Sequence, residues 1–109
     1  MTANTIDTER LDFDWDDAKA EANLCKHGIS FAEAESVFDD PLSAVFNDPD
    51  HSIQEARKII KGHSEQGRLL LVCFVVRGDT LRIISARRLT KPETKEYEEG
   101  KRHRRRHNA

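Results

Sequence analysis

Alternating and helically spaced apolar residues divide the N-terminal part of the chain into short segments. Residues 11–15 alternate apolar and acidic side chains, which is typical of a half-buried strand. The next apolar positions recur at helical spacing and predict a helix, capped by Asp14 or Asp16. It ends near His27, because Gly28 suits the left-handed position after a helix. The stripe that this helix is predicted to turn toward the core comprises Ala18, Ala22, Leu24 and Cys25.

A second helix is predicted directly after the first. Ser30 and Glu33 stand three residues apart, which is the spacing of a capping box. Pro41 disfavours helical geometry in the residue before it, so the helix should end at residues 39–40. Its apolar face comprises Phe31, Ala34 and Phe38.

The remaining pattern predicts four strands and a last helix. Residues 69–76 are apolar on both faces, which indicates a central strand. Polar and glycine-containing segments at 62–67 and 77–80 predict turns. A second capping box, from Thr90 to Glu93, opens the C-terminal helix. The predicted strands cover residues 42–46, 56–61, 69–76 and 81–86.

Helices grouped apart from a strand meander predict an α+β fold. In it, an antiparallel sheet packs on the two N-terminal helices, and a further helix follows at the C-terminus. The 109 residues suffice for one domain. We expect a flexible lead-in at 1–10, a single domain at 11–100 and a basic tail at 101–109.

Composition excludes several classes of protein. No apolar run reaches the roughly 20 residues that a membrane helix needs, and residues 1–10 lack the pattern of a secretory signal. Cys25 and Cys73 have no CxxC or CxxH partner, so neither a disulfide framework nor a zinc site is indicated. Gly62 and Gly67 are not part of a nucleotide-binding loop. We therefore expect a cytoplasmic protein without a cofactor.

The net charge of −2 conceals a strong asymmetry. Residues 1–50 carry three basic and 13 acidic side chains, which sum to −10, whereas residues 51–109 carry 15 basic and seven acidic, which sum to +8. Such a split suggests a basic half that meets a polyanion or an acidic partner. The alternative is that the two oppositely charged halves simply lie against each other, which would give the same charge sums.

Basic side chains gather on the predicted last strands, where guanidinium groups suit phosphate oxygens. Strict alternation would put Arg82 and Arg88 on one face of the sheet and Arg87 on the other. A solvated strand face is the alternative explanation. The candidate RNA-binding residues are Arg57, Lys58, Lys61, Arg68 and Arg82.

RNA can be cut without a metal when the 2′-hydroxyl attacks the neighbouring phosphorus. This reaction needs a base, an acid for the leaving oxygen and cations for the developing charge. His27 can exchange a proton near neutral pH. Glu93 can accept a proton or orient an arginine, and Tyr97 can stack on a base. The candidate cations are Lys26, Arg87 and Arg88.

Each candidate also has a structural explanation. Lys26 and His27 complement a helix dipole, Glu93 completes a capping box, and Tyr97 suits a half-buried packing position. Three further polar residues can bind a cation loosely, although such residues are commoner as turn formers. They are Asp48, Asp50 and His51.

Two segments together resemble the BrnT family. The first reads Asn-Leu-x-Lys-His-Gly at residues 23–28, after Phe-Asp-Trp-Asp at 13–16. The second reads Ile-Ser-Ala-Arg at residues 84–87, followed by Glu93 and Tyr97. The similarity extends over about residues 11–100.

The resemblance implies the toxin of a type II toxin–antitoxin pair, with a RelE-like fold. It further implies a metal-independent ribonuclease that blocks translation, a BrnA-type antitoxin, and operator DNA bound by the complex, largely through the antitoxin. The functional residues that it implies are Lys26, His27, Arg87 and Glu93; Arg88 and Tyr97 come from the chemistry of the residues alone.

Two other hypotheses stay open from the sequence. The first is a non-enzymatic module that binds a protein partner, and DNA through that partner. Such a module would need the same basic surface as an RNA-cutting enzyme. The basic residues 101–106 can also give RNA affinity by themselves.

Overall fold

The computed structural model describes residues 11–48 and 57–108, with side chains as far as Lys101. The expected lead-in at 1–10, together with Asp50 and His51, lies outside the described residues. The observed order of elements matches the predicted order, with ends shifted by a few residues. The elements are β1 (Asp12–Asp14), α1 (Asp17–His27), α2 (Phe31–Ser36), the 3-10 helix η2 (Val37–Asp39), β2 (Ala44–Asn47), β3 (Arg57–His63), β4 (Leu69–Arg77), β5 (Thr80–Arg88) and α3 (Lys91–Asn108).

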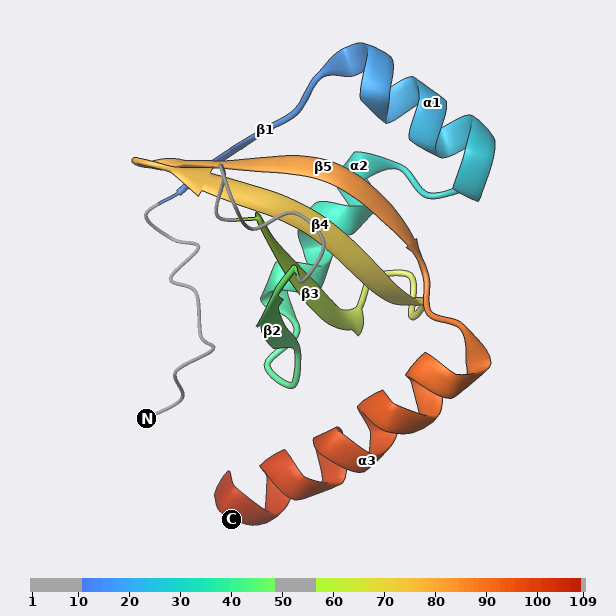
Figure 1. Cartoon of the computed structure of the whole chain (residues 1–109), viewed down its shortest axis with the longest axis vertical. Coiled ribbons are helices and arrows are strands. Elements are labelled where there is room, and N and C mark those ends of the chain that lie inside the picture. The colour runs from blue at the N-terminus through green and yellow to red at the C-terminus, as the bar shows by residue number, and fades with distance from the viewer. Residues whose placement is uncertain (1–10, 49–56, 109) are drawn as a thin grey trace.

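The five strands form one twisted sheet in the order β1-β5-β4-β3-β2, with β4 at its centre as predicted (Figure 1). The α+β class is confirmed, but the sheet is mixed rather than antiparallel, because β1 runs parallel to β5. Phe13 lies opposite Leu81 in this pairing, and both contribute to the core. The alternation within residues 11–15 indicates a strand but carries no information about its direction relative to a distant partner.

The core lies between one face of the sheet and the segment formed by α2 and η2. We call this the core face of the sheet. Phe38 of η2 stacks edge-on between Phe13 and Phe74, with ring centroids 5.2 and 5.0 Å away. The fully buried residues of the core are Ile29, Phe31, Ala34, Val37, Ile60, Leu70, Val72, Phe74, Leu81, Ile83 and Ala86.

Helix α1 does not bury its predicted apolar stripe. Ala18, Ala22, Leu24 and Cys25 are all exposed, and the one fully buried residue of α1 is Asn23. The two alanines lose little by exposure and Leu24 stays 49% exposed, whereas the buried amide of Asn23 makes three hydrogen bonds. Helix α1 therefore lies with its polar residue toward β5.

Gly62 belongs to β3 and not to the following turn, where the sequence suggested it. A Cβ atom at this position would lie 2.8 Å from Cβ of Ser43 and 3.0 Å from the carboxylate of Asp40, so only glycine fits without displacement. The turn itself is shorter and contains Gly67 with φ of 79°. The strand can therefore pass close to the segment that links η2 to β2.

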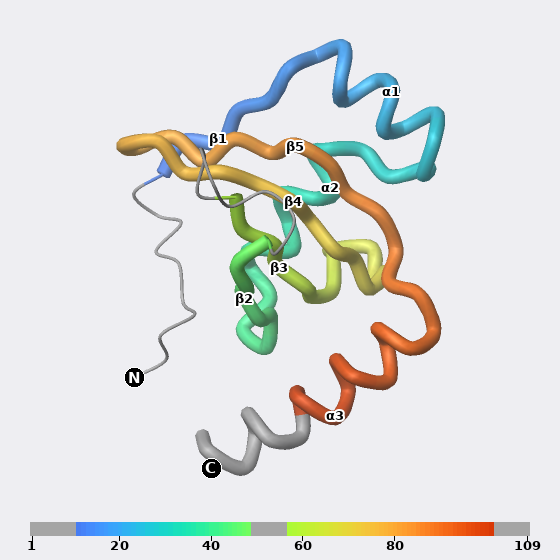
Figure 2. The backbone as a smooth tube through the Cα atoms, viewed as in Figure 1, coloured from blue at the N-terminus to red at the C-terminus, as the bar shows by residue number. Residues whose placement is uncertain are grey.

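Helix α3 continues through the basic segment that was expected to form a tail, and ends at Asn108. Figure 2 follows the trace from the end of β5 directly into this helix. The sheet separates α1, at the top of the view, from α3, at the bottom (Figure 1). Side chains of α3 contact the sheet on the face opposite the core face, at Lys61, His63 and Arg87.

Candidate active site

The prediction that Arg82 and Arg88 share one face of the sheet is wrong. The register of β4 against β5 shifts after Cys73, and Ile84 is skipped in the pairing. Side chains alternate only along an uninterrupted strand, so the bulge exchanges the two faces beyond it. Arg87 therefore shares a face with Arg82, and Arg88 lies on the core face at the end of β5.

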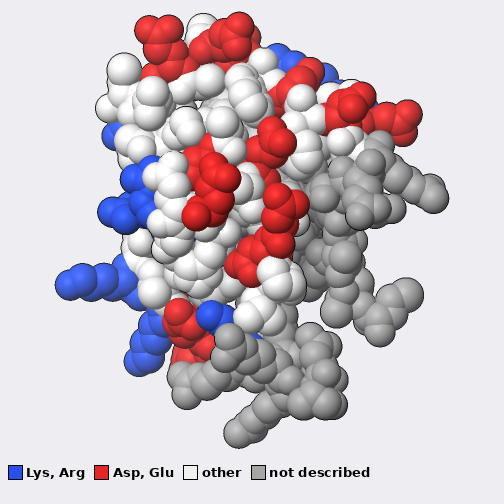
Figure 3. Space-filling model, turned by 180° about the vertical axis from the view of Figure 1, so that it is seen from behind, with Lys and Arg blue, Asp and Glu red and all other residues white. Residues whose placement is uncertain are grey.

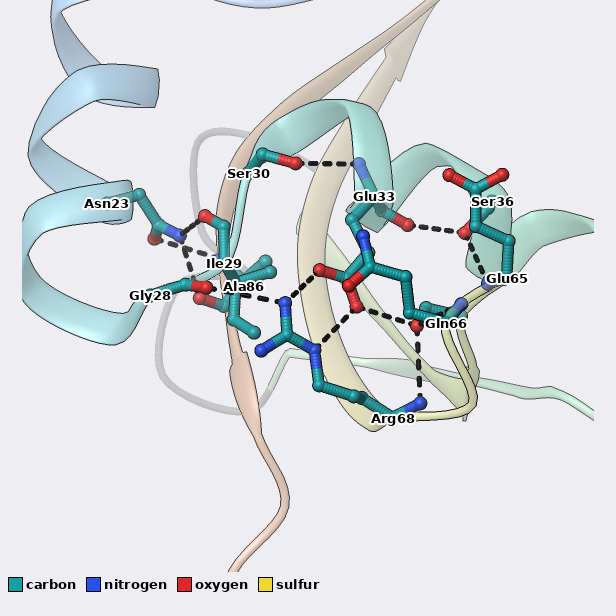
Figure 4. Close-up of polar contacts among 11 residues, drawn as sticks. Asn23, Gly28, Ile29, Ser30, Glu33, Ser36, Glu65, Gln66, Arg68 and Ala86 are labelled. Carbon is teal, nitrogen blue, oxygen red and sulfur yellow. Dashed lines mark hydrogen bonds and ion pairs between the residues drawn. The ribbon is translucent and has the colours of Figure 1, made fainter.

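A buried amide joins the end of α1 to the end of β5. Nδ2 of Asn23 donates to the carbonyl oxygens of Ile29 and Ala86, each at 2.9 Å (Figure 4). Its Oδ1 accepts from the backbone N–H of Ala86 at 3.1 Å. The side chain is 7% exposed, so these bonds are shielded from water. They fix the last turn of α1 beside the point where β5 leaves the sheet.

This contact joins the two segments that carry four of the predicted catalytic residues, although Arg87 and Arg88 leave the strand on opposite faces. Lys26 and His27 follow Asn23 within about one helical turn, and Arg87 and Arg88 follow directly after Ala86, its partner. Lys26, His27 and Arg88 are exposed, and Arg87 is partly exposed. We call this region the α1–β5 corner and define it as residues 26–28, 68 and 86–88.

Arg68 completes the corner from the start of β4. Its Nη2 donates to the carbonyl of Gly28 at 3.4 Å, and the guanidinium holds the carboxylate of Glu33 through both Nε and Nη2 (Figure 4). The hydroxyl of Ser64 donates to the same carboxylate at 2.7 Å. The bond from Arg68 lowers the pKa of Glu33 although burial opposes the change.

The role of Glu33 was not predicted beyond the capping box. Ser30 accepts the backbone N–H of Glu33 at 3.0 Å, as a capping box requires, but the carboxylate turns to Arg68. Glu33 is 2% exposed. An acidic residue between Phe31 and Ala34 on an apolar helix face was the signal in the sequence, because such a charge needs a buried partner.

Arg87 forms a bidentate ion pair with Glu93, with Nη1 and Nη2 at 2.8 and 2.9 Å from the two carboxylate oxygens. The backbone N–H of Thr90 donates to Glu93 at 2.8 Å, which completes the predicted capping box of α3. Hydrogen bonding to Arg87 is the main cause that lowers the pKa of Glu93 to about 2. Glu93 is thus ionised at neutral pH and orients Arg87.

Tyr97 lies one helical turn beyond Glu93 and faces a different part of the molecule. Its hydroxyl donates to the carbonyl of Leu42 at 3.1 Å and lies 3.5 Å from Oδ2 of Asp40, and its ring meets that of His63 edge-on. The residue is 4% exposed. In this conformation the ring is not open to a base, and Tyr97 anchors α3 to the segment before β2.

The structure separates the candidate RNA-binding residues. Only Arg68 belongs to the corner. Arg82 bonds to Asp14 of β1 at 3.1 Å, near the start of β5 and away from the corner. Arg57 lies at this same end of the sheet, because both Arg57 and Arg82 pair with Val75 of β4. Lys61 lies 3.6 Å from Glu96 and over the ring of Phe46. Lys58 donates to Asn47 at 3.0 Å.

The surface charge is segregated as the sequence suggested. Seen from behind, acidic side chains spread over the middle and top of the molecule, while lysines and arginines gather along one side (Figure 3). In Figure 1 this is the side on which α1 ends and α3 begins. The basic side of the molecule therefore includes the α1–β5 corner.

Both cysteines carry free thiols, Cys25 exposed and Cys73 buried. Burial is the main cause that raises the pKa of the Cys73 thiol to about 11, and the nearby carboxylate of Asp48 adds to the effect. Among the side chains described, those of residues 11–48 and 57–101, no group of three or more His, Cys, Asp or Glu is arranged to hold a metal ion. The described helices include none that is long and apolar enough to span a membrane.

The fold and the corner define a small α+β protein with a mixed sheet and a cationic site. A family model described as "Ribonuclease toxin, BrnT, of type II toxin-antitoxin system" matches residues 15–93. The chain therefore belongs to the BrnT family of ribonuclease toxins, as its two motif segments suggested. Toxins of this class are paired with an antitoxin.

A solved structure supports the assignment. The chain is similar to the Brucella abortus ribonuclease toxin BrnT, at 25% identity and a TM-score of 0.58. The similarity covers 74% of this chain and 99% of that one. No curated protein matches the chain. The family match ends at Glu93, so most of α3 lies beyond it.

Proposed function

We propose that this toxin cuts RNA at the α1–β5 corner, without a metal, by attack of the 2′-hydroxyl on the neighbouring phosphorus. The observation that supports the proposal is the bonding of Asn23 to Ala86, because it joins the helix end that carries Lys26 and His27 to the strand end that carries Arg87 and Arg88. The reaction requires a proton-exchanging group and cations, and these two adjoining segments supply both.

The roles follow from the chemistry of each group. His27 takes the proton of the 2′-hydroxyl as its oxygen bonds to phosphorus. The bond from phosphorus to the 5′-oxygen breaks, and that oxygen takes a proton from Lys26 or from water. Arg87, oriented by Glu93, and Arg88 stabilise the charge that builds up on the phosphoryl oxygens. The products are a 2′,3′-cyclic phosphate and a free 5′-hydroxyl.

The family supports the biological setting of this proposal. We propose a RelE-like toxin that acts in the cytoplasm, where cleavage of RNA stops translation. A BrnA-type antitoxin neutralises it, and the complex of the two proteins binds operator DNA, largely through the antitoxin.

Two single substitutions test the site. Arg87→Ala and Lys26→Ala should relieve the growth arrest that follows induction of the wild-type toxin, and circular dichroism should show that both variants fold. Lys19→Ala changes another exposed lysine of α1, far from the corner, and should leave the arrest intact. If neither corner variant relieves the arrest, the site is assigned wrongly.

A second experiment separates an enzyme from a binding module. Purified wild-type protein is incubated with RNA in EDTA, and we expect fragments that end in a 2′,3′-cyclic phosphate. Intact RNA at high protein excess, with tight antitoxin binding retained, would instead identify a non-enzymatic module.

A further inference from the structure

We infer that Asn23 is the positioning residue of the active site: it holds Lys26 and His27 in place against Arg87 and Arg88. The inference rests on the proposed function, since it concerns the same reaction. Asn23 does not itself reach the reacting atoms, because its amide is buried and all its hydrogen bonds go to the backbone.

Asn23 takes the place of a neighbouring strand. β1 pairs with β5 at Thr80, Leu81 and Arg82, and further along this edge the amide of Asn23 bonds to both the N–H and the carbonyl of Ala86. A pair of bonds to one residue fixes both the distance and the orientation of the helix against the strand. The third bond, to Ile29, closes the turn that follows His27 (Figure 4).

Few other interactions determine where α1 ends. Of its apolar residues, Ala20 packs against the core, whereas Ala18, Ala22, Leu24 and Cys25 are exposed, so packing contributes little to the placement of its last turn. Arg68 holds the other side of the turn through the carbonyl of Gly28 at 3.4 Å. His27 stands four residues after Asn23 and thus on the same side of the helix, next to β5. A shift of Asn23 would therefore move His27 directly.

The same contact explains why two short motifs occur together. Asn23 opens the Asn-Leu-x-Lys-His-Gly segment, and Ala86 precedes Arg87 in the Ile-Ser-Ala-Arg segment. The structure joins them through the amide. One motif thus carries the proton-exchanging group together with its positioning residue, and the other carries the cations and the backbone to which that residue binds.

The test uses full-length protein and a fluorescently labelled, mixed-sequence single-stranded RNA in EDTA. Asn23→Ala should lower kcat by about 10- to 100-fold with little change in KM, because misplacement of about 1 Å has effects of this size. Asn23→Asp keeps the volume and the acceptor for Ala86 but loses both donors, and should also lower kcat. Melting curves confirm that each variant is folded at the assay temperature.

Ser36→Ala is the matched control. The hydroxyl of Ser36 donates to the carbonyl of Glu33 and accepts from the N–H of Glu65, so it also cross-links a helix to the sheet region. Its bonds go to Glu33 and Glu65 rather than to residues 26–28 or 86–88, and its loss should leave kcat unchanged. An equal loss of kcat in Ser36→Ala and Asn23→Ala would mean that general loosening, and not positioning, lowers the rate.

A double-mutant comparison excludes a merely structural role. If Asn23 acts by placing His27 together with Lys26, then Asn23→Ala should reduce kcat by a smaller factor in a His27→Ala background than in the wild-type protein. Two outcomes would overturn this inference and leave the proposed function standing. One is that Asn23→Ala lowers kcat by the same factor in both backgrounds. The other is a folded Asn23→Ala variant with wild-type kcat while Arg87→Ala is inactive. Absence of cleavage by the wild-type protein would overturn the proposed function and, with it, the positioning role.

Discussion

Two arginines of the corner, Arg68 and Arg87, are each held by one carboxylate, and the two ion pairs differ in burial. Glu33 is almost fully buried and bonds to Arg68, whereas Glu93 is partly exposed and bonds to Arg87. In both pairs the arginine lowers the pKa of the carboxyl group. Both guanidinium groups are therefore held in one orientation by a carboxylate, and in the proposed reaction this would reduce the cost of reorganisation.

The pair formed by Arg87 and Glu93 predicts a pH dependence of stability. A glutamate titrates near 4.3 in an unfolded chain, whereas the pKa of Glu93 in the folded protein is about 2. A lowered pKa stabilises the folded state at pH values above 4.3, and this contribution is lost as the pH falls toward 2. In Glu93→Gln, the free energy of unfolding should be about 1 kcal/mol lower at pH 7 and should decrease less steeply between pH 5 and 2.5.

Urea titrations at a series of pH values measure both quantities. Glu96→Gln is the control, because Glu96 is 80% exposed in its pair with Lys61. It should keep the wild-type slope, since pairs this exposed contribute little. Equal slopes for wild type and Glu93→Gln would show that the ion pair with Arg87 does not persist in solution.

Helix α3 is the element whose attachment depends most on one side chain. Its first turn is capped by Thr90 and Glu93, and one turn later Tyr97 packs against His63 and bonds to Leu42. Gly100 and Lys101 follow without full burial. These contacts all come from the first two turns of α3, and they attach the start of the helix to the rest of the molecule. The family match ends at Glu93, within this attached part.

The position of Tyr97 predicts different effects for its two substitutions. Tyr97→Phe loses the bond to the Leu42 carbonyl and should lower the free energy of unfolding by about 1 kcal/mol, whereas Tyr97→Ala should lower it by about 3 kcal/mol. Chemical denaturation measures both. Tyr97→Phe should cleave RNA at the wild-type rate; a folded but inactive Tyr97→Phe would mean that the hydroxyl takes part in the reaction.

At the scale of the molecule, the face seen from behind carries its Lys and Arg side chains along one side, from which the proposed RNA substrate would approach (Figure 3). The acidic N-terminal half and the basic C-terminal half do not neutralise each other completely, since Lys and Arg gather along the side where α1 ends (Figure 3). A polyanion is attracted to such a surface, and its affinity then depends on salt because bound counterions are released.

This distribution predicts that the salt dependence of RNA affinity differs between arginines at the corner and arginines away from it. Arg88→Gln should weaken RNA binding and lower the slope of log affinity against log salt by about 1. Arg82→Gln should change the slope less, because Arg82 pairs with Asp14 away from the corner. Fluorescence anisotropy of labelled RNA at increasing KCl measures both. A larger effect for Arg82 than for Arg88 would place the RNA near the pairing of β1 with β5, away from the corner.

Short-range signals account for the elements that were predicted well. Ser30 caps α2 and Gly28 ends α1 with φ of 71°, as their sequence neighbours indicated. The apolar run of residues 69–76 is the central strand. Caps, turns and periodicity depend on residues within about four positions of one another, so they can be recognised from the sequence.

Several features of the site depended on residues far apart in the chain. The skip at Ile84 reversed the faces of Arg87 and Arg88, and nothing in the local alternation marks it. The partnership of Glu33 with Arg68 joins residues on α2 and at the start of β4, and the capping box concealed it. Asn23 resembled an ordinary polar helix residue until Ala86 was placed beside it.

By itself, the sequence determined the order of elements, the α+β class, the family and the segregation of charge, because each depends on composition, on local pattern or on a motif. Only the tertiary structure decided that β1 runs parallel to β5, which face carries Arg87, and that the buried side of α1 is the side of Asn23. These depend on backbone hydrogen bonds between distant segments, whose partners are chosen when the whole core packs.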